Sequence, residues 1–124
     1  MLALLLLLNA TAAVACEDYT STGKHQEYVE AINDLPVYKS MVVLNDGATV
    51  FDSPEGRIVQ VSLRGPAEDM ASATSFYKKV LPTLGWHPRV GKFYRNKEIL
   101  DMDVISEKCQ TFRIDFALKP TSKE

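Results

Sequence analysis

The segment FDSPEGR, residues 51–57, most constrains the fold, because it is a turn between two short apolar runs. Pro54 suits the second position of a type I turn, and Gly56 suits the left-handed position that closes a bulged hairpin. In the following residues 58–64, apolar and polar side chains alternate, as in a strand with one buried face. The segment therefore predicts a β-hairpin in an antiparallel sheet.

A helix is expected after this strand. Gly65 and Pro66 end the strand, and Pro66 suits a first helical position, with acids at 68 and 69 complementing the positive end of the dipole. Pro82 and Gly85 predict that the helix ends or bends near residue 81. Apolar residues recur at spacings of three and four and predict a core-facing stripe: Met70, Ala73, Phe76, Tyr77, Val80, Leu81 and Leu84.

Three more strands are expected at residues 86–95, 98–105 and 111–118, the last with a clean two-residue period. A two-residue turn at Asn96 and Lys97 places Phe93 opposite Leu100. A loop at residues 106–110 places Leu100, Met102 and Val104 opposite Phe116, Ile114 and Phe112, so that apolar faces apolar.

These elements predict an α+β fold of one domain. The expected sheet is antiparallel, with about five strands and one main helix on one face, in the order β-β-α-β-β-β. A short N-terminal helix is expected within residues 25–34. With 124 residues and 46% hydrophobic content, the chain has enough material for one core. We expect the domain to span residues 25–119, followed by a C-terminal tail at 120–124.

The first fifteen residues predict a signal peptide. They contain no charge, include the run LALLLLL and end in Ala13-Val14-Ala15, small residues that favour cleavage before Cys16. The run is too short for a membrane-spanning helix, which needs about 20 apolar residues. Residues 16–24 are mostly polar and predict a tether. The chain is therefore expected to be exported.

Cys16 has two expected fates. The sequence AVAC resembles the lipobox of bacterial lipoproteins, which implies a diacylglycerol on the Cys16 thiol and attachment to the periplasmic side of a membrane. Simple cleavage would instead leave Cys16 able to form a disulfide with Cys109 in an oxidising compartment. Lipidation would leave Cys109 as a free thiol. We rank lipidation first and keep both.

Charge and composition exclude several other classes. The formal charge is -2, with acids and bases interspersed, so no basic surface for nucleic acid is expected. Two cysteines and two histidines, far apart, predict no zinc site, and single scattered glycines predict no phosphate loop. We therefore expect no metal and no cofactor.

The best polar candidates are acidic side chains on the predicted exposed face. Asp101 and Asp115 could act as an acid and base pair or bind a hard cation. The expected register, however, places Asp103 opposite Arg113 and Asp101 between Lys92 and Asp115. Cross-strand ion pairing therefore explains most of the cluster, and no catalytic residue is assigned.

His87, in the segment WHPR, is a weak candidate for a general base. No serine or cysteine is tied to it by a known motif. The preferred interpretation is a partly exposed histidine at the edge of a strand.

The helix and its end resemble a known pattern. Phe76-Tyr77 followed by Leu81-Pro82 and Leu84-Gly85-Trp86 is similar to an uncharacterised family of small exported bacterial proteins and lipoproteins. The resemblance covers residues 35–116 and rests on core and turn residues. It implies the fold and no activity, so no functional residue is carried over.

We therefore expect a non-catalytic envelope protein, periplasmic or anchored to the membrane through Cys16, that acts as a binding or structural module. Its partner would be an unknown protein or small molecule, and no nucleic acid. One alternative is a small hydrolase or lyase that uses Asp115 with Asp101 or His87. Another is a soluble, disulfide-closed periplasmic binding domain.

Overall fold

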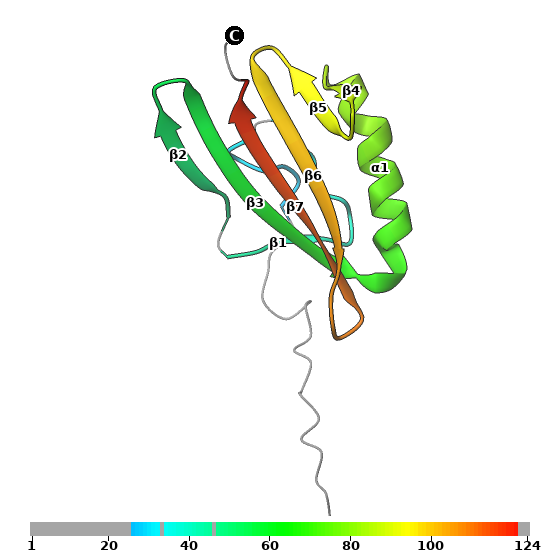
Figure 1. Ribbon diagram of the computed structural model, residues 1–124. Coiled ribbons are helices and arrows are strands. Elements are labelled where there is room, and N and C mark those ends of the chain that lie inside the picture. Colours follow the sequence, from blue (N-terminus) through cyan, green and yellow to red (C-terminus); the bar gives the residue numbers. More distant parts are fainter. Residues whose placement is uncertain (1–25, 33, 46, 122–124) are drawn as a thin grey trace, which may run out of the picture.

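The computed structural model describes residues 26–32, 34–45 and 47–121, and these form one antiparallel sheet and one α-helix (Figure 1). The expected α+β class is confirmed. The predicted signal peptide (1–15), the tether (16–24) with Cys16, and residues 122–124 lie outside the described residues. The elements are β1 (Val42–Val43), β2 (Thr49–Ser53), β3 (Gly56–Pro66), the short 3-10 helix η2 (Ala67–Asp69), α1 (Met70–Thr83), β4 (His87–Arg89), β5 (Lys92–Arg95), β6 (Glu98–Ser106) and β7 (Thr111–Pro120).

The sheet has seven strands instead of about five, in the order β1-β3-β7-β6-β5-β4, with β2 also paired to β3. The expected single strand at residues 86–95 is two strands, β4 and β5. Between them, Val90 and Gly91 have φ angles of 48° and 75°, so the chain reverses in a tight turn there. A β-branched residue rarely adopts a positive φ, and for this reason Val90 gave no turn signal.

The register between β5 and β6 is as expected, with Phe93 opposite Leu100. The expected register between β6 and β7 is wrong by two residues, because Leu100 lies opposite Leu118. The Glu107 N–H donates to the Thr111 carbonyl over 3.0 Å, which reduces the loop to residues 108–110. A shift of two residues keeps each side chain on its face and changes only its partner.

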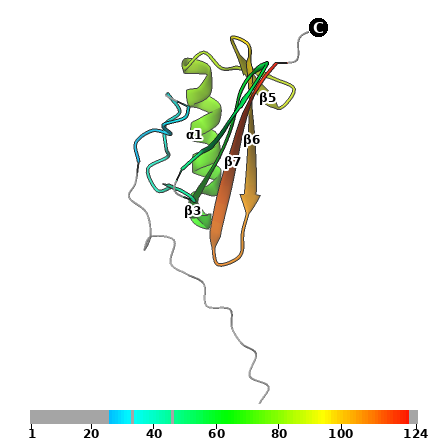
Figure 2. The same cartoon turned by 90° about the vertical axis from the view of Figure 1, so that its left-hand side faces the viewer.

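One face of the sheet is covered by α1 and by residues 26–32 and 34–41, as Figure 2 shows. We call this the covered face. The expected helical stripe is confirmed, since Ala73, Tyr77 and Leu81 are fully buried. The strands contribute alternate residues to the same core: Val59, Val61, Leu63, Phe93, Leu100, Phe112, Ile114, Phe116 and Leu118.

Tyr77 joins the layers of the covered face. Its hydroxyl accepts a hydrogen bond from the Tyr38 N–H (3.0 Å) and donates one to the Pro36 carbonyl (2.8 Å). Its ring meets the Phe116 ring edge-on, with 5.0 Å between centroids. Burial raises the pKa of the Tyr77 hydroxyl, which therefore stays protonated and able to donate.

The prediction of a short N-terminal helix at residues 25–34 is wrong. The described residues of this segment form turns, and Tyr28 pairs with Pro36 in an isolated antiparallel bridge. Val29, Ile32 and Leu35 are nevertheless buried, because hydrogen bonds from the Val29 N–H to the Leu35 carbonyl and from the Leu35 N–H to the Ile32 carbonyl curl the chain. Two helical turns have little stability of their own, so tertiary burial decides the conformation.

Candidate functional site on the open face of the sheet

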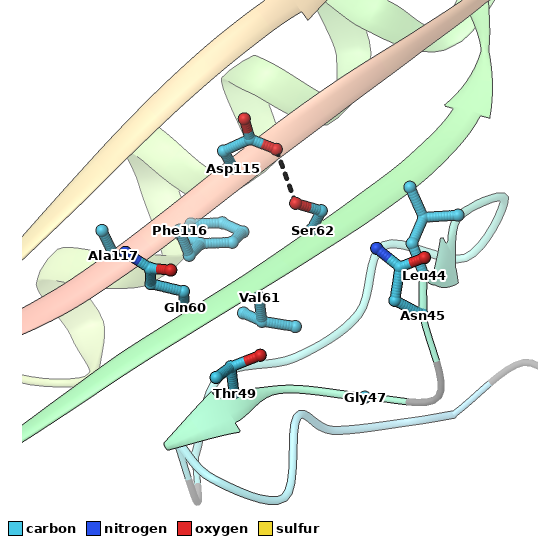
Figure 3. A pocket seen from close by; sticks show the side chains of 10 residues that line it. All are labelled: Leu44, Asn45, Gly47, Thr49, Gln60, Val61, Ser62, Asp115, Phe116 and Ala117. Atoms are coloured by element: carbon cyan, nitrogen blue, oxygen red, sulfur yellow. Dashed lines mark hydrogen bonds between the residues drawn. The ribbon is translucent and has the colours of Figure 1, made fainter. Parts of the chain in front are cut away.

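The other face of the sheet carries the alternate residues of β3, β6 and β7, and we call it the open face. It holds a shallow cavity of about 350 Å³ between the β1–β2 loop and strands β3 and β7 (Figure 3). Ala117 and Ser62 have small side chains, and this leaves the hollow between longer neighbours. Polar side chains that line the cavity are those of Asn45, Thr49, Gln60, Ser62 and Asp115.

Asp115 lies at the rim of this cavity and is held by two partners. Its Oδ1 accepts hydrogen bonds from Ser62 Oγ and from Arg113 Nε, both at 2.7 Å. Its Oδ2 accepts one from Arg113 Nη2 at 3.1 Å. Both carboxylate oxygens are therefore engaged, and the geometry fixes the position of a carboxylate that can accept further polar contacts from solvent or a ligand.

Glu107 extends this network to the end of the sheet. Its two carboxylate oxygens receive a bidentate pair from Arg64, at 2.7 and 3.0 Å, and Arg113 Nη1 donates to the same carboxylate at 3.2 Å. The hydrogen bonds that Arg64 donates lower the pKa of Glu107, and the hydrogen bonds that Arg113 donates to Asp115 raise the pKa of Arg113. The four charges of Arg64, Glu107, Arg113 and Asp115 alternate in sign along the network.

Asp101 is the second acidic candidate and has two cationic neighbours. Its carboxylate lies 3.5 Å from Lys92 Nζ, as expected, and 4.0 Å from Lys119 Nζ. The prediction that Asp101 lies next to Asp115 is wrong, because Ala117 lies opposite Asp101. The expected pairing of Asp103 with Arg113 is also wrong.

Asp103 lies directly opposite Asp115, and Arg113 lies opposite Ile105. The two-residue shift of register causes both differences. Asp115 forms its ion pair with Arg113, two residues away on the same strand, and not with a residue across the sheet.

His87 lies on β4, outside the cavity that Asp115 lines. It is exposed at the start of the edge strand β4, opposite Tyr94, whereas the cavity is lined from β2, β3, β7 and the β1–β2 loop. Asp115 lines that cavity, and neither Asp101 nor His87 is among the residues that do. The structure thus does not bring the three candidates into one pocket.

Cys109 lies in the tight turn between β6 and β7, with a φ of 68°, and it is disulfide-bonded. The sequence contains one other cysteine, Cys16, which lies outside the described residues. The turn is at the end of the open face that carries Glu107 and Arg113.

Sequence reasoning missed the polar residues that line the cavity. The alternation along residues 58–64 predicts that Gln60 and Ser62 are on the exposed side of a strand, but nothing in the sequence marks the loop residue Asn45 as their neighbour. Asn45 has a φ of 54°, a left-handed conformation that asparagine tolerates, and the β1–β2 loop passes the edge of β3 there. The one feature of the sequence that could have indicated a cavity is Ala117, a small residue at a position of β7 where the alternation predicts an exposed side chain.

Two arginines outside the cavity have structural partners. Arg57 donates to the Glu98 carboxylate (3.1 Å) and to the Ala31 carbonyl (2.7 Å), which fixes the N-terminal segment to the sheet. Arg95 lies over the Trp86 ring, 4.2 Å from its centroid, and also contacts Asp34. These contacts explain both charges without a ligand.

Within the described ranges, no three His, Cys, Asp or Glu residues cluster in a way that could hold a metal ion, and no helix is long and apolar enough to cross a bilayer. In comparisons with protein-family models, curated proteins and solved structures, nothing matches this chain.

Proposed function

We propose that this chain is an exported, non-catalytic binding domain of a bacterial envelope. The observation that carries the proposal is the mutual pairing of the candidate groups: Asp115 with Arg113 and Ser62, and Asp101 with Lys92 and Lys119. Carboxylates held in this way are suited to present fixed charges. The shallow cavity beside Asp115 offers Asn45, Thr49 and Gln60 for hydrogen bonds to a small polar ligand.

The state of Cys16 determines how the domain is retained. The disulfide at Cys109 supports a bond to Cys16, since the chain has no other cysteine. On this proposal the domain is soluble in the periplasm after cleavage before Cys16. A second candidate is the lipoprotein, supported by the sequence AVAC, in which lipid on Cys16 would anchor the domain and Cys109 would need a thiol from another molecule.

Intact mass spectrometry of the protein from native soluble and membrane fractions tests the proposal. We expect a chain that begins at Cys16, in the soluble fraction, with a mass lower than the reduced chain by one pair of hydrogen atoms. Reduction should restore that mass, and Cys109→Ser should abolish the difference. A mass raised by a diacylglycerol would favour the lipoprotein, and retention of residues 1–15 would contradict export altogether.

Binding at the cavity can be tested by NMR with a panel of monosaccharides, amino acids and dicarboxylates. We expect amide shifts centred on Asn45, Thr49 and Gln60 for at least one class. Gln60→Ala should weaken the response, whereas His87→Ala, on the distant edge of the sheet, should leave it unchanged. A response centred on His87 or Asp101 would favour the hydrolase alternative.

A further inference from the structure

The two edge strands of the sheet are protected to different degrees. On one edge, β4 has three residues, all exposed, and includes Pro88, which has no N–H to offer a partner. Short strands, prolines and charges are the usual protections of a sheet edge. On the other edge, β2 has five residues, TVFDS, with no proline or basic residue. Val50 and Phe51 are 51% and 54% exposed.

The outer edge of β2 presents backbone groups to solvent. The Ser62 carbonyl of β3 accepts a hydrogen bond from the Leu44 N–H on this same edge, so alternate residues of β3 point their polar groups toward β2. Thr49 and Phe51 of β2 lie opposite those alternate residues, Gln60 and Ile58. It follows from strand geometry that the N–H and C=O groups of Val50 and Asp52 point outward. No described segment pairs with them.

Charge selects the kind of strand that fits this edge. Arg57 lies opposite Asp52, but its guanidinium donates to the Glu98 carboxylate and to the Ala31 carbonyl. The acids of β2 and its turn are Asp52 and Glu55. A second copy pairing through its own β2 would bring these acids together, which is unfavourable. A basic strand would be attracted by them.

We propose that β2 is a strand-addition site for an extended segment of another protein with alternating apolar and basic side chains. The backbone groups of Val50 and Asp52 would extend the sheet, which is the known mode of β-strand addition. Apolar side chains of the segment would pack on Phe51, which lies beside Ile58 and on the opposite face of β2 from Asp52. Basic side chains would reach Asp52 and Glu55.

This inference rests on the proposed role as a binding domain and names its partner class. The proposed function and the strand-addition site can be contradicted by different experiments. The mass of the mature chain tests export and the state of Cys16, whereas strand addition at β2 is tested by peptide binding with the full mature chain.

The probe is a synthetic heptapeptide of alternating lysine and valine, KVKVKVK, titrated by NMR and calorimetry. We expect shifts confined to β2 and its flanking loop, with a micromolar dissociation constant. The matched control is the same peptide with N-methylated valines, which keeps the charge and loses the N–H groups that pair with a strand. Equal binding of the N-methylated peptide would overturn the proposal, because charge alone would then explain the attraction.

Two sets of variants locate the site. Val50→Pro removes the outward N–H and should weaken binding about tenfold, whereas Val50→Thr keeps it and should change binding less than about twofold. If Val50→Pro disturbs the fold, the double variant Asp52→Asn with Glu55→Gln tests the same surface. It should weaken binding several-fold and reduce its dependence on salt.

Three results would contradict strand addition. The first is undiminished binding by a folded Val50→Pro variant or by the double variant. The second is a set of shifts centred on β4 instead of β2. The third is a wild-type dimer in sedimentation equilibrium that Val50→Pro converts to a monomer, because the edge would then be occupied by a second copy.

Discussion

The two faces of the sheet are made by the same strands and have opposite chemistry. In β7, Phe112, Ile114, Phe116 and Leu118 are buried on the covered face, and Arg113, Asp115, Ala117 and Lys119 lie on the open face. The covered face packs against α1 and residues 26–32 and 34–41. The open face is occupied by charges that bind one another.

The difference indicates where the stability of the domain lies. Burying one large apolar side chain stabilises a fold by about 1.5–3 kcal/mol, whereas a partly exposed ion pair contributes about 0–1 kcal/mol. The covered face therefore holds the domain together. The open face is available for binding because folding depends on it far less.

The largest expected effect is on the covered face, at Phe116. Its side chain is 1% exposed and contacts the Tyr77 ring. Phe116→Ala should lower the free energy of unfolding by about 3–5 kcal/mol, because it removes buried surface and leaves a cavity. Urea denaturation measures this. Ala117→Ser, on the next residue and the open face, is the matched control and should change it by less than about 0.5 kcal/mol.

A smaller effect is expected at the hydroxyl of Tyr77. Tyr77→Phe keeps the ring and leaves the Tyr38 N–H and the Pro36 carbonyl without this partner. The expected loss is about 1–3 kcal/mol, with faster hydrogen exchange of the Tyr38 amide. Tyr94→Phe, on the open face, should have little effect. Equal losses for the two variants would contradict the difference between the faces.

On the open face, Glu107→Gln should cost about 1 kcal/mol at neutral pH, because the bidentate pair with Arg64 and the contact with Arg113 lose their charge. Arg64 lowers the pKa of Glu107 below its usual value of about 4.5. Its contribution is therefore present above that value and is lost as the pH falls through the lower pKa of the folded state.

Urea denaturation at several pH values measures this dependence. The difference between wild type and Glu107→Gln should shrink as the solution is acidified below pH of about 4.5. A difference that grows on acidification would contradict the assignment of Glu107 as the ionised partner of Arg64.

The smallest expected effect is at Asp103. It lies directly opposite Asp115, and like charges in opposing strands repel. Asp103→Asn should stabilise the domain by about 0.3 kcal/mol at low salt, and the gain should disappear at high salt. Thermal unfolding at two ionic strengths measures it. A destabilised variant would show that Asp103 has a favourable role.

The faces could be predicted from the sequence, and the partners across the sheet could not. Alternating apolar residues assigned Phe112 and Ile114 to the core, and the helix stripe was correct. The predicted register of β6 against β7 was wrong by two residues. The sequence pattern could not distinguish the two registers, because either one places apolar side chains opposite apolar side chains. The loop between β6 and β7 is shorter than expected because Cys109 and Gln110 adopt positive φ angles. No feature of the sequence predicts these angles.

The candidate site was predicted in part. Its acids lie on the open face as expected, but the cavity depends on the β1–β2 loop, which approaches β3 only in the folded chain. The contacts of Arg57 and Arg95 with Ala31 and Asp34 also join segments far apart in sequence, which periodicity cannot detect.

The most direct test of the two-face account is urea unfolding of one combined variant, in which the network on the open face becomes neutral: Arg64→Gln, Glu107→Gln, Arg113→Gln and Asp115→Asn. We expect a single cooperative transition with an unchanged m-value and a free energy of unfolding lower by about 2 kcal/mol, less than the loss in Phe116→Ala. A chain without a cooperative transition, or a loss as large as that of Phe116→Ala, would contradict it.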